Sequence, residues 1–276
     1  MDFDFLYKPF HLKELCAQYG FSPSKRYGQH FLISPAPVAK MMKAADLKNT
    51  DTIVEIGPGF GSLTLPVSEK VERVYAFEIE QRLKPYWEGL TEKHKNIHII
   101  WGNALNALPV FPDIETRPYK VLANLPYQIT SQTFRTLFEL KNLPRLVACM
   151  VQKEVAERIC AKAGDMSILS VSVQYFGHPQ VIAQVPRGAF WPQPKVDSSI
   201  ILITDIHRNQ NNEAFFNLIR AAFSNKRKQA WRNICTVLNI PQERVKGELF
   251  EVAGNEKIRA QELSLAQWKD LFQRLD

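Results

Sequence analysis

The sequence predicts an α/β fold with a mostly parallel sheet, followed by a small all-helical domain. Between residues 52 and 151, short apolar runs alternate with longer amphipathic segments, as is typical of a parallel sheet covered by helices. Two further strand-like runs come next. After Asp205 the strand signals stop and only helical ones remain. These observations predict two domains of different architecture.

The elements of the first domain can be placed in order. Apolar runs of strand length predict buried strands at Thr52–Ile56, Val74–Ile79, Ile97–Trp101, Tyr119–Ala123 and Leu146–Val151. Amphipathic segments predict helices at Ser62–Lys70, Gln81–Lys93, Ser131–Leu140 and Lys153–Ala163. The two later runs, Ile168–Phe176 and Ser199–Thr204, would form an antiparallel hairpin at the sheet edge and complete a seven-stranded sheet.

The segment between those two runs is rich in residues that interrupt regular structure. They are Pro179, Pro186, Gly188, Pro192 and Pro194. We therefore expect no regular element there. The aromatic pair Phe190 and Trp191 favours an ordered, functional loop.

Helix signals place the elements of the second domain. Asn211 or Asn212 can cap a helix that runs to Phe223, and Asn225 can cap the basic helix after it. Pro241 suits a first helical turn, and Ser264 with Gln267 forms a capping box. The predicted divisions are an N-terminal extension (1–24), the α/β domain (25–205) and the helical domain (206–276).

The composition excludes several classes of protein. The chain has 276 residues, 45% of them hydrophobic and 23% charged, which is ordinary for a globular protein. No apolar stretch approaches a membrane span, and the acidic N-terminus has neither a signal nor a transit pattern. The four cysteines form no C-x-x-C pair and have no histidine at zinc spacing. We therefore expect a cytoplasmic protein without a metal site, and we also expect a monomer.

Positive charge is concentrated in two windows, and the net charge is +7. Residues 220–232 contain no acid, and neither do residues 25–43. The bases of interest are Lys25, Arg26, Arg220, Lys226, Arg227, Lys228 and Arg232. These windows are either solvated helix faces or two clamps on a phosphate backbone, and charge alone does not decide between them.

A glycine-rich turn follows the first predicted strand. Its glycines, Gly57, Gly59 and Gly61, are spaced G-x-G-x-G, not G-x-G-x-x-G as in dinucleotide-binding proteins. This spacing suits a nucleoside without phosphates, although such loops are often only tight turns.

Two further strand ends support a nucleoside site. Glu78 lies 21 residues after Gly57 at the end of the second strand, where a carboxylate can accept both ribose hydroxyls. We interpret Glu80 as a surface residue. The third strand ends in Trp101-Gly102-Asn103-Ala104, which would face the base. The three strand ends predict an adenosine site, better suited to S-adenosylmethionine than to NAD.

The fourth strand ends in Asn124-Leu125-Pro126-Tyr127, where we place the chemistry. An exocyclic amine is a poor nucleophile because its lone pair is delocalised into the ring. The Asn124 side-chain oxygen and the Leu125 carbonyl could accept its two N–H groups, with Pro126 restricting the orientation of that carbonyl. Tyr127 offers a face on which the base can stack. The alternative is that these residues form an ordinary turn.

Together, these segments resemble the small-subunit ribosomal RNA adenine dimethyltransferases of the KsgA family, in their bacterial form. The similarity follows the family's order from residue 25 to about 265. It rests on Lys25–Leu32, Ile53–Thr64, Asn124–Tyr127, Gln152–Ala156, Phe190–Ser198 and Ala222–Lys228.

The resemblance implies a Rossmann-like S-adenosylmethionine-dependent methyltransferase fold and a specific reaction. Four methyl groups pass to the N6 amino groups of two adjacent adenosines in the 3′-terminal hairpin of small-subunit (16S) rRNA, and S-adenosylhomocysteine is the product. The target base must leave its stack. The substrate would be rRNA in an immature small subunit, so a role in subunit biogenesis is expected.

The resemblance also implies roles for individual residues. The target base would stack between Phe190 and Tyr127, and the basic residues at 25–26 and 220–232 would bind rRNA phosphates. The cofactor would contact Gln29, His30, Leu32, Gly57, Gly59, Glu78, Ile79, Asn103, Ala104 and Asn124. We assign no general-base role to His30, because the methylated ammonium is acidic enough to lose its proton to water.

Two residues depart from the family pattern, and Gln193, where Pro is common, is the milder change. Asn103 stands where the family usually has Asp, and an amide accepts from the adenine amino group less strongly than a carboxylate does. We therefore expect weaker cofactor binding without loss of activity.

Three alternatives compete with this interpretation. A large-subunit rRNA adenine methyltransferase of the macrolide-resistance type shares the glycine turn and the asparagine motif, but the complete Phe190–Ser198 segment favours the small-subunit enzyme. A non-catalytic ribosome-assembly factor would not need an intact Asn124–Tyr127. An NAD-dependent enzyme is disfavoured by the glycine spacing.

Overall fold

The computed structural model describes residues 3–24, 28–209 and 212–275. Its described chain forms two compact units, one of residues 1–156 and 180–206, the other of residues 157–179 and 207–276. The N-terminal segment belongs to the first unit. Residues 157–179 belong to the second, so the helical unit includes a segment that precedes the boundary expected at residue 206.

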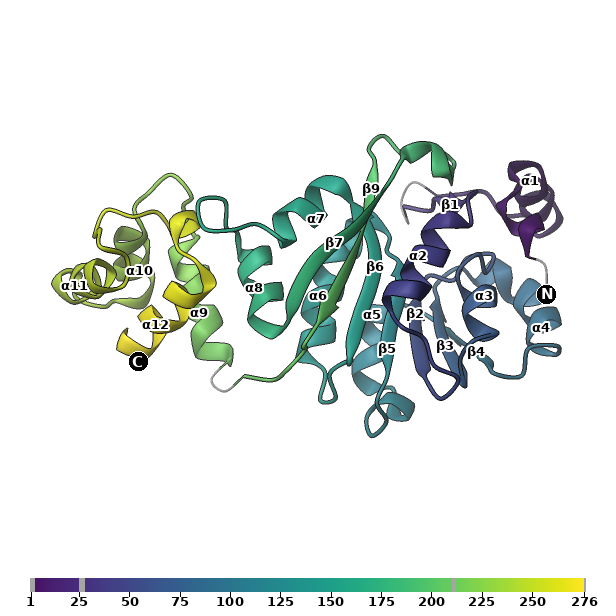
Figure 1. Cartoon of the computed structure of the whole chain (residues 1–276), viewed down its shortest axis with the longest axis horizontal. Coiled ribbons are helices and arrows are strands. Elements are labelled where there is room, and N and C mark those ends of the chain that lie inside the picture. The colour runs from purple at the N-terminus through teal and green to yellow at the C-terminus, as the bar shows by residue number, and fades with distance from the viewer. Residues whose placement is uncertain (1–2, 25–27, 210–211, 276) are drawn as a thin grey trace. The chain divides into compact units, whose positions relative to one another are not determined.

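A seven-stranded, mostly parallel sheet forms the centre of the first unit, as predicted (Figure 1). Its strands lie in the order β4-β3-β2-β5-β6-β9-β7. They are β2 (Thr52–Ile56), β3 (Arg73–Glu78), β4 (Ile97–Trp101), β5 (Lys120–Asn124), β6 (Leu146–Gln152), β7 (His178–Val185) and β9 (Ser198–Thr204). β2 pairs in parallel with both β3 and β5, and β9 runs antiparallel to β6.

The chain order changes direction beside β2, and this positions the site. From β2 the chain proceeds outward to β3 and β4, and then returns to place β5 on the other side of β2. In open α/β sheets, ligands bind at such a switch point, at the carboxyl ends of the strands. A site is therefore expected where β2, β3 and β5 end.

Helices and a short ladder complete the first unit. Its α-helices are α1 (Pro9–Gln18), α2 (Ala36–Ala44), α3 (Thr64–Ser68), α4 (Lys84–Thr91), α5 (Ala104–Ala107) and α6 (Thr130–Glu139), and α7 (Lys153–Ile159) crosses into the second. α2 and α3 contribute Val38, Met41 and Val67 to a core cluster with alternate residues of the strands. β1 (Phe31–Leu32) pairs with β8 (Phe190–Trp191), which joins two segments far apart in the sequence.

The second unit is built of packed helices. They are α8 (Ile168–Phe176), α9 (Asn212–Ala222), α10 (Ala230–Leu238), α11 (Gln242–Ala253) and α12 (Leu265–Leu275). Tyr175 of α8 stacks on Phe215 of α9 with ring centroids 4.2 Å apart. The predicted capping box of α12 is confirmed: the Ser264 amide donates to the Gln267 side chain, and the Gln267 amide donates back to the Ser264 hydroxyl.

One strand of the predicted edge hairpin is wrong, whereas the other, Ser199–Thr204, is confirmed as β9. Residues 168–176 form helix α8 instead of a strand, because Ser167 and Ser170 build a capping box at its start. A short apolar run fits a buried helix as well as a strand, and this local signal decides between them. The edge strand is instead β7, in the segment expected to lack regular structure. Pro179 is tolerated there because an edge strand needs only one set of partners.

The predicted basic helix is also wrong at its start. Residues 226–228 form a turn, and α10 begins only at Ala230. The Asn225 side chain accepts from the Arg227 amide, so it stabilises this turn instead of capping a helix. Of the two proposed caps for α9, Asn211 lies outside the described residues and Asn212 is already helical.

Candidate functional site

The glycine turn adopts a conformation that other residues would resist. Gly57, Gly59 and Gly61 have φ angles of 75°, 55° and 85°. A Cβ atom on Gly59 would also lie 2.9 Å from Cε1 of Phe31. The turn therefore needs glycine at this position both for its backbone conformation and for the space beside Phe31.

A cavity lies where the ends of β2, β3 and β5 meet the segment before β1. It brings together most of the residues predicted from the sequence. Those that line it are Gln29, His30, Gly57, Gly59, Glu78, Ile79, Asn124, Leu125, Pro126 and Tyr127. This convergence of separate segments supports a single binding site for the predicted nucleoside and target base.

Glu78 is held at the end of β3 by two backbone amides. Its Oε2 accepts from the Gly59 amide at 3.0 Å, and its Oε1 accepts from the Glu80 amide at 2.8 Å. The carboxylate is buried, and burial raises its pKa above the ordinary value. Each oxygen retains a lone pair, so the group can still accept from a diol in the cavity.

Glu55 is a cavity residue that the sequence interpretation missed. It lies in β2 with 2% of its surface exposed, and it lines the cavity. Burial, with the nearby Glu78 carboxylate adding to it, raises the pKa of Glu55 to about 8. The available signal was an acid inside the otherwise apolar run Ile53-Val54-Glu55-Ile56.

The interpretation of Glu80 as a surface residue is wrong. Only 7% of it is exposed, and its carboxylate binds Arg82 at 2.7 Å. This ion pair lowers the pKa of Glu80. The two acids, separated by Ile79, thus have different surroundings, and only Glu78 of the pair lines the cavity.

Asn124 is fixed by the segment before β1. Its Nδ2 donates to the His30 carbonyl at 3.1 Å. A carbonyl only accepts, so the amide nitrogen must face it, and the side-chain oxygen is available as an acceptor. The His30 ring in turn stacks on Tyr127, and its Nδ1 lies 2.6 Å from the Pro192 carbonyl oxygen.

The Tyr127 hydroxyl is positioned by Ser198, whose Oγ lies 2.8 Å away. Burial raises the pKa of Tyr127, so its phenol stays protonated at neutral pH. Tyr127 therefore offers the cavity a neutral aromatic face, consistent with a stacking role and not with a role as a base.

Four predicted residues do not line the cavity. Leu32 is fully buried in the core, and Phe190 is 2% exposed in the same cluster. Asn103 caps α5 by accepting from the Leu105 amide at 3.0 Å, and the neighbouring Ala104 is buried. The stacking of Phe190 on a target base and the contact of Asn103 with adenine therefore stay predictions.

The predicted RNA-binding residues of the helical unit are all exposed. They are Arg220, Lys226, Arg227, Lys228 and Arg232. Arg232 and Lys246 each lie over the Trp231 ring, at 5.0 and 4.8 Å from its centroid. The other two, Lys25 and Arg26, lie outside the described residues.

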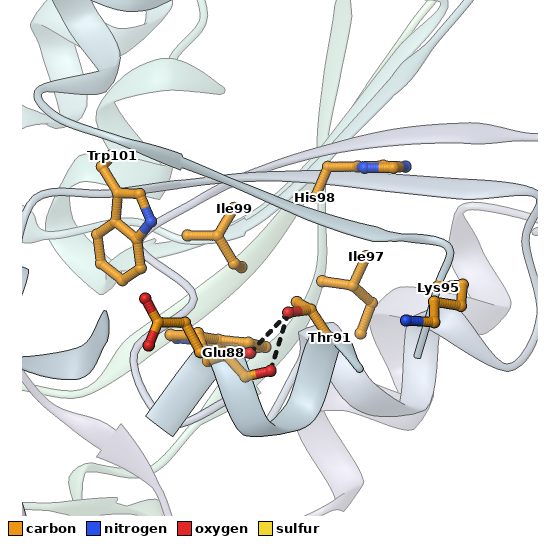
Figure 2. A pocket seen from close by; sticks show the side chains of 8 residues that line it. Glu88, Thr91, Lys95, Ile97, His98, Ile99 and Trp101 are labelled. Atoms are coloured by element: carbon orange, nitrogen blue, oxygen red, sulfur yellow. Dashed lines mark hydrogen bonds between the residues drawn. The ribbon is translucent and has the colours of Figure 1, made fainter. Parts of the chain in front are cut away.

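A second pocket lies between α4 and the edge strand β4 (Figure 2). Ile97, Ile99 and Trp101 of β4 line it, opposite Glu88 and Thr91 of α4. The Thr91 hydroxyl donates hydrogen bonds to the carbonyls of Trp87 and Glu88. None of the predicted site residues lines this pocket.

Within the described ranges, no group of three or more His, Cys, Asp or Glu residues is arranged to hold a metal ion. The helices of this part of the chain also include none that is both long and apolar enough to cross a bilayer.

Comparisons with known proteins agree with the predicted family. The family model described as "Ribosomal RNA adenine dimethylase" matches residues 20–276. "Ribosomal RNA small subunit methyltransferase A" of Dehalococcoides mccartyi (strain CBDB1) is 40% identical over 266 residues, which cover 94% of this chain and 90% of that protein. The protein of the same description from Geobacillus thermodenitrificans (strain NG80-2) is 34% identical, with coverage of 97% and 96%.

Solved structures confirm the predicted fold class. A dimethyladenosine transferase from Plasmodium falciparum matches with a TM-score of 0.72 and 28% identity, over 88% of this chain and 96% of that one. The 23S rRNA methyltransferase ErmE matches with a TM-score of 0.71 and 24% identity, over 89% and 99%. At that identity, the similarity to ErmE concerns the fold alone.

Proposed function

The chain belongs to the ribosomal RNA adenine dimethylase family, and on this premise we propose how its cavity supports the reaction. The protein is an rRNA adenine dimethyltransferase that methylates the N6 amino groups of two adjacent adenosines in the 3′-terminal hairpin of small-subunit (16S) rRNA. The observation that carries the proposed mechanism is the position of Asn124, held by His30 at the edge of a cavity that also contains Glu78.

The cavity suits S-adenosylmethionine. Glu78 is buried at the cavity wall with its oxygens oriented by two amides, as the recognition of a ribose diol requires. The glycine turn brings backbone close to the same space without side chains. When bound, the cofactor supplies an electrophilic methyl group on a sulfonium. Gln29, His30, Gly57, Glu78 and Ile79 would hold it.

The residues after β5 would position the target amine. Asn124 Oδ1 and the Leu125 carbonyl accept its two N–H groups, which directs the nitrogen lone pair out of conjugation and toward the methyl group. Tyr127 supports the face of the base, with its hydroxyl anchored on Ser198. The proton released after methylation passes to water, so no side chain is needed as a base.

The helical unit would bind RNA through exposed bases. The cluster at 226–228 and its neighbours Arg220 and Arg232 would contact phosphates. The substrate particle would be an immature small subunit in the cytoplasm, bound by a monomer of this chain. A role in subunit biogenesis would follow, because the proposed substrate is a subunit that is still being assembled.

The large-subunit alternative is not favoured. The curated relatives that cover nearly the whole chain are described as small-subunit methyltransferases. A non-catalytic assembly factor is disfavoured because Asn124, Leu125, Pro126 and Tyr127 are all present around the cavity.

Labelled S-adenosylmethionine tests the proposal, with undermethylated small subunits and large subunits offered in parallel. We expect label on two adjacent adenosines of small-subunit rRNA, two methyl groups on each. Label confined to the large subunit would contradict the proposed substrate. Cofactor binding without transfer to either subunit would contradict the proposed roles of Asn124 and Tyr127.

A further inference from the structure

Three aromatic side chains donate hydrogen bonds to the backbone of the glycine turn. Trp87 Nε1 donates to the Gly59 carbonyl at 3.0 Å, and the Tyr86 hydroxyl donates to the Phe60 carbonyl at 2.7 Å. The Tyr7 hydroxyl donates to the Ser62 carbonyl at 2.8 Å. Three carbonyls within four residues are thus held by donors from two separate segments.

These donors approach from outside the cofactor cavity. Gly59 and Ser62 line that cavity, whereas Tyr7, Tyr86 and Trp87 do not. Trp87, a residue of α4, instead lines the second pocket. A Cβ atom on Gly61 would lie 3.1 Å from Cη2 of Trp87, so the indole also packs directly against the turn.

Fixing these carbonyls affects the cavity because the C=O of one residue and the N–H of the next lie in one rigid peptide plane. The Phe60 carbonyl, which accepts from Tyr86, shares its plane with the Gly61 N–H, and this N–H donates to the Pro58 carbonyl at 2.8 Å. The Pro58 carbonyl in turn shares its plane with the Gly59 N–H, which donates to Glu78, the carboxylate proposed to hold the ribose. Bonds to the outer carbonyls therefore restrict the turn that orients Glu78.

Tyr7 connects the N-terminal segment to this arrangement. Residues Leu12, Leu15 and Cys16 of α1 belong to a buried cluster with Phe60 and Leu65. Phe21 also packs edge-on against Phe60, with ring centroids 5.7 Å apart. The segment thus covers the outer side of the glycine turn with apolar contacts and one hydrogen bond.

We propose that Tyr7, Tyr86 and Trp87 are positioning residues for the cofactor. Through Tyr7, segment 3–21 thereby contributes to cofactor binding. This inference rests on the proposed binding of S-adenosylmethionine in the cavity. Burial raises the pKa of Tyr7 to about 12 and raises that of Tyr86 as well, so both phenols stay donors at physiological pH.

Conservative variants test the proposal without removing aromatic packing. Tyr7→Phe and Tyr86→Phe each delete one hydroxyl and leave the ring. The matched control is Tyr119→Phe, because the Tyr119 hydroxyl also donates to a carbonyl, that of Asn142 at 2.9 Å, and does not line the cavity. All three variants remove a similar bond, but only two remove it from the glycine turn.

Affinity for S-adenosylmethionine, KM, kcat and the unfolding temperature are then compared. Loss of one such bond is expected to weaken cofactor binding about three- to tenfold in the two test variants. The KM for the cofactor should rise in parallel while kcat stays near the wild-type value. Tyr119→Phe should lower the unfolding temperature and leave affinity unchanged. An equal decrease of affinity in the control, or wild-type affinity in both test variants, would overturn the proposal.

Amide hydrogen exchange in the free protein separates this inference from the proposed function. Exchange at residues 57–64 should be faster in Tyr7→Phe and Tyr86→Phe than in wild type or Tyr119→Phe. Unchanged exchange at the turn would contradict the positioning role even if the wild type binds cofactor. Failure of the wild type to bind S-adenosylmethionine would contradict the proposed function, and the exchange result would still decide whether the aromatic donors fix the turn.

Discussion

The side-chain amide of Asn124 donates to the main-chain carbonyl of His30 over 3.1 Å, although the two residues are 94 positions apart. This bond links the end of β5 to the segment that enters β1. It also settles the orientation of the amide, since only the nitrogen can donate to a carbonyl. The oxygen of Asn124 therefore faces away from this bond, as its proposed role as acceptor for the target amine requires.

Replacing Asn124 should abolish most of the methyl transfer. Asn124→Ala removes both the acceptor and the bond to His30, and we expect kcat to fall about 100-fold or more. Asn124→Asp should also be impaired, because a carboxylate oxygen would face the His30 carbonyl. Single-turnover transfer to undermethylated small subunits measures both. Asn106→Ala, an exposed change in α5, serves as the control. Retention of more than about a tenth of kcat in Asn124→Ala would contradict the assigned role.

Glu78→Gln should weaken cofactor binding, and Glu80→Gln should not. In the first variant an amide nitrogen replaces one of two oxygens that accept from Gly59 and Glu80. We expect about tenfold weaker binding or more, because the variant can no longer form hydrogen bonds through a charged group. Glu80→Gln breaks the ion pair with Arg82 but lies outside the cavity. Calorimetric titration with S-adenosylmethionine distinguishes the two variants. Equal decreases in affinity would mean that Glu78 affects cofactor binding only by stabilising the fold.

Asn103→Asp should tighten cofactor binding. In the structure, Asn103 accepts from the Leu105 amide, and Asp would keep this cap while adding a charged acceptor. We expect the affinity for S-adenosylmethionine to rise about two- to fivefold with kcat little changed. Calorimetry on both proteins measures this. An unchanged or weaker affinity would mean that residue 103 does not contact the adenine.

The affinity for RNA should fall steeply with rising salt concentration, because the basic turn at residues 226–228 would contact phosphates. Removing one side chain that neutralises a phosphate should reduce the slope of log K against log salt by about 0.7 to 0.9. The triple variant Lys226→Gln, Arg227→Gln, Lys228→Gln is therefore expected to bind the rRNA hairpin more weakly and with a shallower slope. Lys70→Gln, an exposed change after α3, is the control. An unchanged slope in the triple variant would mean that the side chains of this turn are exposed to solvent and do not contact phosphates.

The sequence was sufficient to predict six of the seven strands and the cavity residues at the strand ends, because both follow from local signals. The strand ends carry Gly57, Glu78 and Asn124, and parallel strands bring their ends to one edge whatever the details of packing. Helix α8 was missed because its apolar run also fits a strand, and only the Ser167–Ser170 capping box distinguishes them.

Other features depended on contacts between distant segments. The burial of Glu80 results from its partner Arg82 and the packing around it. The bonds from Tyr7, Tyr86 and Trp87 to the glycine turn involve backbone carbonyls, which leave no pattern in the sequence. The buried position of Phe190 follows from the β1–β8 ladder, whose strands are only two residues long.

Glu55 should make the protein less stable as the pH rises. Its pKa is about 8 in the folded chain, against 4.5 for an exposed glutamate. Between these values the folded state retains a proton that the unfolded state has released. The free energy of unfolding should therefore fall with rising pH, by at most about 1.4 kcal/mol per pH unit from this group. Glu55→Gln mimics the protonated form and should flatten the dependence, leaving the contribution of Glu78, whose pKa is also raised by burial and which therefore has the same sign. Urea unfolding of both proteins at several values between about pH 5 and pH 8 measures the two slopes. Identical slopes would show that Glu55 is ionised in the folded protein and that the cavity solvates it better than its burial implies.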